Sequence, residues 1–322
     1  MNLRQNKYVK IFMIENGAII YNKQTRKSCI LGEMEYKVYS LLDGTKELED
    51  ISVLCQVDED ALTGLLQIFN KYELLECNEI DNPPPKAFLG KRTLFYGIRY
   101  PRFISSSIFR RFMNMLFLLS FPLLIASVFF MNGKVNIDEI IKSVNVIHLL
   151  TMDIFLAVSI SIHEFFHALF AHINGAFCAE IGYKFDFLCP VAYTTLCGVN
   201  RIPSKYKKIQ IFLSGMASNA FIASISLLAM NSPALNNNIF LFMIFSVNLC
   251  LIIVNCITAG NTDLYLVFTV LSNDCYLRRN ALQSIKNKTL AKNLFNFMYL
   301  LFTFVLQPAI IIMLLAIALM KI

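Results

Sequence analysis

The chain has 322 residues, of which 56% are hydrophobic and 16% are charged. Typical soluble proteins carry about 25% charged residues, and a chain this apolar is neither disordered nor a small disulfide-linked secreted domain. The formal charge of +7 is unevenly spread, because residues 1–80 hold 9 basic and 13 acidic side chains. Such an acidic N-terminal part does not suit nucleic acid. The sequence therefore predicts an integral membrane protein with the lipid bilayer as a partner.

The first 80 residues predict a small α+β domain in the cytosol. Residues 8–30 contain two β-prone runs, and the Glu-Asn-Gly sequence at 15–17 suits the turn of a hairpin between them. The spacing of apolar residues predicts three short helices, over 33–42, 47–54 and 58–72. Leu74 and Leu75 are expected to form a closing strand.

Residues 81–111 are predicted to connect this domain to the membrane. The DNPPPK run at 81–86 is too rich in proline for a helix or a central strand, which is typical of a linker. Residues 88–111 mix aromatic and basic side chains, and we expect them to lie at the membrane surface.

Five apolar segments follow, each long enough to cross about 30 Å of hydrocarbon at about 1.5 Å per residue. They cover residues 112–131, 146–170, 211–230, 239–257 and 295–320. The predicted fold class is therefore mostly α, with a polytopic helical membrane domain over residues 112–322.

The loops predict the orientation of these segments, because cytoplasmic loops are enriched in Lys and Arg. The loops after the first and third segments contain only Lys134 and Lys142. The loops after the second and fourth segments each contain five basic residues: Lys184, Arg201, Lys205, Lys207 and Lys208 in one, and Arg278, Arg279, Lys286, Lys288 and Lys292 in the other. This distribution predicts a multi-pass protein of the cell membrane with a cytosolic N-terminus and an external C-terminus.

The second apolar segment carries the pattern His163-Glu164-x-x-His167. Residues four apart on a helix lie about 40° apart around its axis, so both imidazoles can bind one metal ion, and Glu164 is placed to take a proton from metal-bound water. Ionisable groups inside an apolar span each cost about 2.5 to 3.5 kcal/mol at its centre, so three of them in one turn predict a function rather than a simple cap.

A catalytic zinc site also needs a third protein ligand. His172 is nine residues after His163 and therefore half a turn out of phase, so we expect it at the membrane interface instead. Glu180 is a possible third ligand. Asp263 is a better one, because it follows the fourth segment on the same cytosolic side where the second segment ends.

With these residues the chain resembles the site-2 protease class of intramembrane zinc metallopeptidases. Members combine the HExxH helix with a later Asn eight residues before a ligand Asp, matched here by Asn255 and Asp263. They also have a Gly-x-x-x-Asn helix start between the two, matched by Gly215 and Asn219. The resemblance covers about residues 150–270.

This resemblance implies a set of functional residues. They are His163, His167 and Asp263 as ligands of Zn²⁺, Glu164 as the catalytic general base, and Asn255 or Asn219 as a donor to the oxyanion. Two positions depart from the class, since Thr258 replaces the usual Pro and Leu264 replaces the Gly after the ligand Asp. These departures concern the local backbone of the Asp263 segment more than the ligand.

Residues 175–200 leave two alternatives open. Their β-prone, Pro-containing stretches can supply an edge strand that holds an extended substrate, because irregular backbone at membrane depth must line a cavity or be buried in protein. The alternative is an ordinary cytosolic hairpin.

Residues 31–76 resemble PqqD-like and related winged-helix domains, which recognise the leader segments of ribosomally made peptides. The resemblance implies that an extended leader adds to the edge of a sheet. A generic helical regulatory domain is the alternative. Together the two parts resemble peptide zinc metalloproteases of the YydH-like kind, whose genes lie beside those of modified-peptide precursors.

The sequence thus predicts a zinc metalloendopeptidase that removes the leader of a modified precursor peptide before export. The expected partners are the precursor peptide, a peptide-modifying enzyme and an exporter. Two alternatives remain open: a regulatory protease that releases a membrane-tethered factor, and a non-catalytic membrane protein for peptide immunity or transport.

Overall fold

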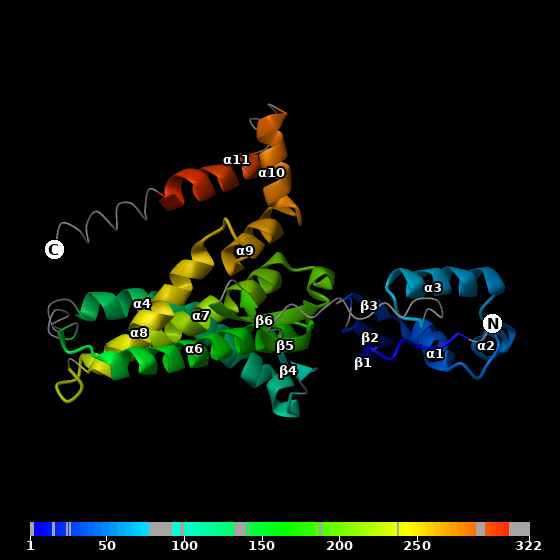
Figure 1. Cartoon of the computed structure of the whole chain (residues 1–322), viewed down its shortest axis with the longest axis horizontal. Helices are drawn as coiled ribbons and strands as arrows, with labels where there is room; N and C mark the ends of the chain where they lie inside the picture. The colour runs from blue at the N-terminus through cyan, green and yellow to red at the C-terminus, as the bar shows by residue number, and fades with distance from the viewer. Residues whose placement is uncertain are drawn as a thin grey trace. The chain divides into compact units, whose positions relative to one another are not determined.

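The computed structural model describes most of the chain, and it divides into two compact units (Figure 1). The described residues are 3–14, 17–23, 25, 27–76, 92–96, 100–131, 140, 142–186, 189–236, 238–287 and 294–308. The first unit combines Met1–Ile98 with Phe177–Gly198, and the second combines Arg99–Ala176 with Val199–Ile322. The predicted proline linker at 81–86 lies outside the described residues.

The first unit begins with an antiparallel sheet in the order β1-β2-β3, formed by β1 (Val9–Ile14), β2 (Gly17–Asn22) and β3 (Ser28–Leu31). The predicted hairpin is confirmed, because Ile14 pairs with Gly17 across its end. Gly17 has a φ of 133°, and a Cβ at this position would collide with the carbonyl oxygen of Leu31. A glycine is therefore required where the turn enters β2.

Three helices follow the sheet, close to their predicted limits: α1 (Glu33–Leu41), α2 (Leu48–Cys55) and α3 (Glu59–Lys71). Asp58 begins α3 by accepting hydrogen bonds from the backbone N–H groups of residues 60 and 61. The buried Tyr39 hydroxyl donates to the carbonyl of Leu74 at 3.1 Å, and burial raises the pKa of Tyr39. The predicted closing strand is reduced to a single bridge between Gln5 and Leu75.

A second antiparallel sheet in the first unit has the order β4-β5-β6. It consists of β4 (Arg92–Tyr96), β5 (Phe177–Asp186) and β6 (Cys189–Cys197). Residues 175–200 therefore contain a β-hairpin. It is compatible with both alternatives, an edge strand for an extended substrate and an ordinary cytosolic hairpin. The strand at 92–96 was not predicted, since this stretch was expected only to lie at the membrane surface.

The two sheets of the first unit share a small apolar core. Ile19 and Tyr21 of β2 pack with Ala179 and Cys197 of the hairpin, and the rings of Phe12 and Phe177 lie 4.3 Å apart. The hairpin that follows the HExxH helix in sequence thus groups with the N-terminal residues, which the sequence did not predict.

The second unit contains four helices that are long and apolar enough to cross a membrane. They are α4 (Ser107–Met131), α6 (Val146–Ile173), α7 (Lys205–Met230) and α8 (Ile239–Cys256). Four of the five predicted segments are thereby confirmed as helices, although α4 and α7 begin five and six residues before the predicted limits of 112 and 211. Of the fifth segment, the structure describes the part up to residue 308.

Helix α7 is the central helix of the second unit. It packs against α4, α6, α8 and α9. In its apolar stretch of 18 residues 67% is buried, compared with at most 22% in the corresponding stretches of the other three long helices. Its buried face is rich in small residues, including Gly215, Ala217, Ala220 and Ala223. Small side chains let neighbouring helices approach closely, so this face of α7 sets the position of the α6 side chains that point toward it.

Shorter elements complete the second unit (Figure 1): α9 (Asp263–Ser272), α10 (Leu277–Lys286), α11 (Leu294–Leu301) and a π-helical turn at Phe302–Leu306. Tyr265, Leu277 and Tyr299 form the centre of their apolar core. The turn from residue 257 to residue 262 connects α8 to α9 and delivers Asp263 as the first residue of α9.

Candidate metal centre

The two histidines of the HExxH pattern lie one turn apart on α6, where both are buried. Their Nε2 atoms are 3.1 Å apart. Gly215 of α7 lies directly against them, and a Cβ at this position would be 2.5 Å from the Nε2 atoms of both His163 and His167. Only a glycine leaves this space open, which gives a physical reason for the Gly in the Gly-x-x-x-Asn pattern.

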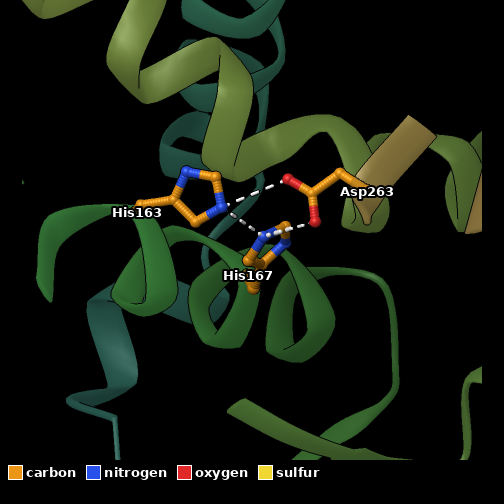
Figure 2. Close-up of side chains that lie close together, drawn as sticks. All are labelled: His163, His167 and Asp263. Atoms are coloured by element: carbon orange, nitrogen blue, oxygen red, sulfur yellow. Dashed lines mark hydrogen bonds and ion pairs between the residues drawn. The ribbon is translucent and has the colours of Figure 1, made fainter. Parts of the chain in front are cut away.

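Asp263 completes the cluster from the start of α9 (Figure 2). Its Oδ2 lies 3.1 Å from Nε2 of His163, and its Oδ1 lies 3.3 Å from Nε2 of His167. The carboxylate is only 8% exposed, and burying a charge is costly unless another charge compensates it.

The spacing of these atoms fits a bound metal ion. One ligand atom from each of His163, His167 and Asp263 lies within 4.8 Å of the others. Two ligands bound about 2.1 Å from a tetrahedral zinc ion lie about 3.4 Å apart, which is close to the observed separations of 3.1 to 3.3 Å. Two imidazoles and one carboxylate are also a common donor set for catalytic zinc. The residues present therefore fit the predicted zinc ion.

The orientation of His167 is set by the backbone of α7. Its Nδ1 lies 2.8 Å from the carbonyl oxygen of Ile211, with the Ser214 hydroxyl at 3.4 Å. A carbonyl oxygen only accepts hydrogen bonds, so Nδ1 carries a proton, and in the neutral imidazole Nε2 then keeps its lone pair. The lone pair then points toward Asp263, as a metal ligand requires.

The orientation of His163 is set by Asn219, one turn after Gly215 on α7. The Nδ2 atom of Asn219 lies 2.9 Å from Nδ1 of His163, whereas Oδ1 of Asn219 is buried without a hydrogen-bond partner. An amide is a donor at one end and an acceptor at the other. In the observed orientation the Nδ2 end of Asn219 donates to Nδ1 of His163, so the proton of the neutral imidazole lies on Nε2. If the amide is rotated by 180°, its Oδ1 faces Nδ1 instead, and the proton must lie on Nδ1. The rotated amide satisfies Oδ1 and frees Nε2 to bind a metal.

Glu164 follows His163 on α6 and is half-buried. It interacts electrostatically with His167, so its carboxylate lies within range of the cluster. In an HExxH helix this residue is the one beside the ligands rather than one of them, and its carboxylate is absent from the converging group. Glu164 is therefore beside the converging group and not part of it.

The other candidate residues lie outside the cluster. Glu180 is buried in β5 and accepts a hydrogen bond from Thr195 at 3.2 Å. Among the described residues, the group that could hold a metal ion consists of His163, His167 and Asp263 and does not include Glu180. The side chain of Asn255 donates to the carbonyl of Leu251 within α8 at 3.0 Å, so its oxyanion role stays a prediction. His172 stacks on Tyr100 with ring centroids 4.6 Å apart and is not part of the converging group.

The turn that carries Asp263 is held by the last described helix, which the sequence did not reveal. The backbone N–H of Thr258 donates to Oε1 of Gln307 at 3.2 Å, and its hydroxyl lies 2.7 Å from that of Thr303. Gln307 also donates to the carbonyl of Cys256, and Tyr299 donates to that of Thr258 at 3.1 Å. The Thr that replaces the usual Pro therefore makes contacts that a Pro cannot. The one available signal was a Gln inside an apolar segment.

Comparisons with known proteins add nothing to this geometry. No family model matches the chain, and no curated protein or solved structure is significantly similar to it.

Proposed function

We propose that the chain is a membrane-embedded zinc metalloendopeptidase that cleaves a precursor peptide. The observation that carries the proposal is the convergence of His163, His167 and Asp263 from two helices far apart in sequence, with Glu164 beside them. Four helices long and apolar enough to span a membrane support the location. The distribution of Lys and Arg supports a cytosolic N-terminus.

The residues divide the chemistry among them. His163, His167 and Asp263 would hold the zinc ion, which when bound supplies Lewis-acid activation of a water and of the scissile carbonyl. Glu164 accepts the proton of the attacking water and passes it to the leaving amine. Asn219 and the Ile211 carbonyl hold the two imidazoles in the required orientation.

A precursor peptide as substrate is supported by the resemblance of residues 31–76 to leader-binding domains. It is also supported by the hairpin at 177–197, which belongs to the same compact unit as those residues. A protease must hold its substrate extended, and a strand edge offers the backbone groups to do so. The peptide-modifying enzyme and the exporter belong to the same proposal as partners.

The test compares three forms of the full-length protein in lipid nanodiscs, each loaded with zinc. The forms are the wild type, Glu164→Gln and Asp153→Asn, which removes an exposed carboxylate from the same helix. The probe is a mixed library of synthetic peptides, and mass spectrometry counts the new termini. We expect the wild type and Asp153→Asn to cleave alike and Glu164→Gln to cleave at least 100-fold more slowly.

Zinc content keeps the result interpretable. Glu164→Gln should bind as much zinc as the wild type, because this residue is not a ligand. The Asp263→Asn variant should bind zinc at least 10-fold less tightly than the wild type, whereas Glu180→Gln should not change the affinity for zinc. Cleavage by Glu164→Gln at the wild-type rate would refute the protease assignment, and normal zinc affinity in Asp263→Asn would refute the ligand set.

A further inference from the structure

An open pocket of about 810 Å³ lies between α9 and α10 in the second unit. The described residues that line it include three cations, Arg278, Arg279 and Lys286, and no Asp or Glu. The wall formed by α9 includes Tyr265, and Asn261 lines the pocket from the preceding turn. The lining of the pocket therefore includes one residue shortly before Asp263 in the sequence and one shortly after it. All charged side chains of this lining are positive.

The three cations differ in what they contact. Arg278 is engaged by the protein: it donates to the carbonyl of Gly260 and to Oδ1 of Asn261, and its guanidinium lies 4.5 Å from the ring centre of Tyr265. Arg279 and Lys286 are exposed, and no hydrogen bond or ion pair joins either of them to another described residue. Two charged donors at the pocket are thus available for a ligand.

These two free cations share one face of α10, because residues seven apart are nearly in phase on a helix. Leu282 lies between them on that face and is 45% exposed, and Tyr276 at the start of the helix is 69% exposed. The opposite face, with Leu277 and Ala281, is buried in the core. One side of α10 thus presents positive charge and apolar surface together.

We propose that this pocket binds the phosphate headgroup of an anionic phospholipid from the surrounding bilayer. Arg279 and Lys286 would pair with the phosphate, and Leu282 and Tyr276 would contact the start of the acyl chains. Cations on apolar stems suit the boundary between headgroups and hydrocarbon. The inference rests on the membrane insertion proposed above, where this loop faces the cytoplasmic leaflet.

The pocket is linked to the candidate metal centre through Arg278. This side chain contacts Gly260 and Asn261, which belong to the turn before Asp263. A headgroup bound beside Arg278 adds a counter-charge that keeps the guanidinium in place. Lipid binding would thereby stabilise the position of the Asp263 ligand.

Native mass spectrometry of the full-length protein in detergent can test the pocket directly. Phosphatidylglycerol or neutral phosphatidylcholine is added, and bound lipid is counted. We expect the wild type to bind phosphatidylglycerol at least 10-fold more tightly than phosphatidylcholine. The double variant R279Q/K286Q should lose about 30-fold in affinity for phosphatidylglycerol, since each cation near a membrane surface contributes about a fivefold factor.

A matched double variant distinguishes a site from general surface charge. R201Q/K207Q also removes one exposed Arg and one exposed Lys from the second unit, neither of which lines the pocket, and should bind phosphatidylglycerol like the wild type. An equal loss in both double variants, or no loss in R279Q/K286Q, would overturn the proposal. So would displacement of the lipid by an equal concentration of inorganic phosphate. Because the readout is bound lipid, a failure of the protease assignment leaves this result standing.

Discussion

Asn219 contacts His163 at 2.9 Å through an amide whose other end has no hydrogen-bond partner. This arrangement is unbalanced, because a fully buried Oδ1 without a partner costs about 1 to 3 kcal/mol. The amide rotated by 180° avoids this cost, because its Oδ1 then accepts from Nδ1–H of His163 and fixes the orientation of that imidazole. We infer that Asn219 is a positioning residue for a metal ligand.

Replacement of Asn219 tests this role through metal affinity. Asn219→Leu keeps the approximate volume but removes the acceptor, so zinc should bind about 10- to 100-fold more weakly. Asn219→Asp keeps an acceptor and should retain more of the affinity than Asn219→Leu. Competition with a chromogenic chelator measures both constants in the purified protein. Wild-type affinity in Asn219→Leu would show that His163 does not depend on this contact.

Gly215 is predicted to be the most sensitive position on α7. In Gly215→Ala the added Cβ would lie 2.5 Å from the Nε2 atoms of both His163 and His167. Either α7 moves away from α6 or the histidines turn, and both changes should abolish zinc binding measured by elemental analysis. Gly64→Ala on α3 is a matched control, because a Cβ there meets nothing within 4 Å. It should stabilise the protein by roughly 0.5 to 1 kcal/mol without changing zinc content.

The packing between the two sheets of the first unit predicts the reactivity of a cysteine. Cys197 is 3% exposed, and burial raises its pKa, so less thiolate is present at a given pH. The exposed Cys275 should therefore react with a maleimide much faster than Cys197 in the full-length protein. Ile19→Asp places a charge in the shared core, and we expect it to raise the labelling rate of Cys197 by 10-fold or more.

Peptide mapping after labelling identifies which thiol reacted. Ile11→Asp is the control, because Ile11 is 37% exposed on β1 and lies outside the shared core. It should leave Cys197 protected. If Cys197 were labelled equally fast in the wild type and in Ile19→Asp, the sheet of residues 9–31 would not cover the hairpin in solution.

The sequence predicted those parts of the fold that depend on local patterns. The hairpin, the three short helices and four apolar helices follow from periodicity, turn residues and length, which act within one segment. Strand β4 was missed, because its pairing with β5 joins residues more than 80 positions apart. The grouping of the hairpin with the N-terminal sheet was missed for the same reason.

The candidate site divides in a similar way. His163 and His167 were predictable because a helix fixes their relative position. Asp263 was predictable because it follows the fourth apolar segment on the side where the second one ends, and the resemblance added its spacing from Asn255. The roles of Gly215 and Asn219 depend on how closely α7 approaches α6, which spacing within one helix does not determine. The support of the Asp263 turn by Gln307 likewise joins two distant segments, so no local pattern contains it.

Thr258 provides the last prediction, because it stands where the protease class that the sequence resembles has a proline. Thr258→Pro removes the N–H that donates to Gln307 and the hydroxyl that meets Thr303. Each lost hydrogen bond contributes about 0.5 to 1.5 kcal/mol, and unpaired buried partners cost more. We therefore expect Thr258→Pro to lower both thermal stability and zinc affinity. Thr258→Val, which keeps the N–H, should have a smaller effect.

A double-mutant cycle with Gln307→Leu shows whether the two residues act together. If the hydrogen bond to Gln307 is the main reason that Thr258→Pro is harmful, the combined variant should be less affected than the sum of the two single variants by about 0.5 kcal/mol or more. Thermal unfolding in detergent and zinc competition measure the two properties separately. Strict additivity, or a Thr258→Pro protein as stable as the wild type, would mean that the Asp263 turn holds its position without the last helix.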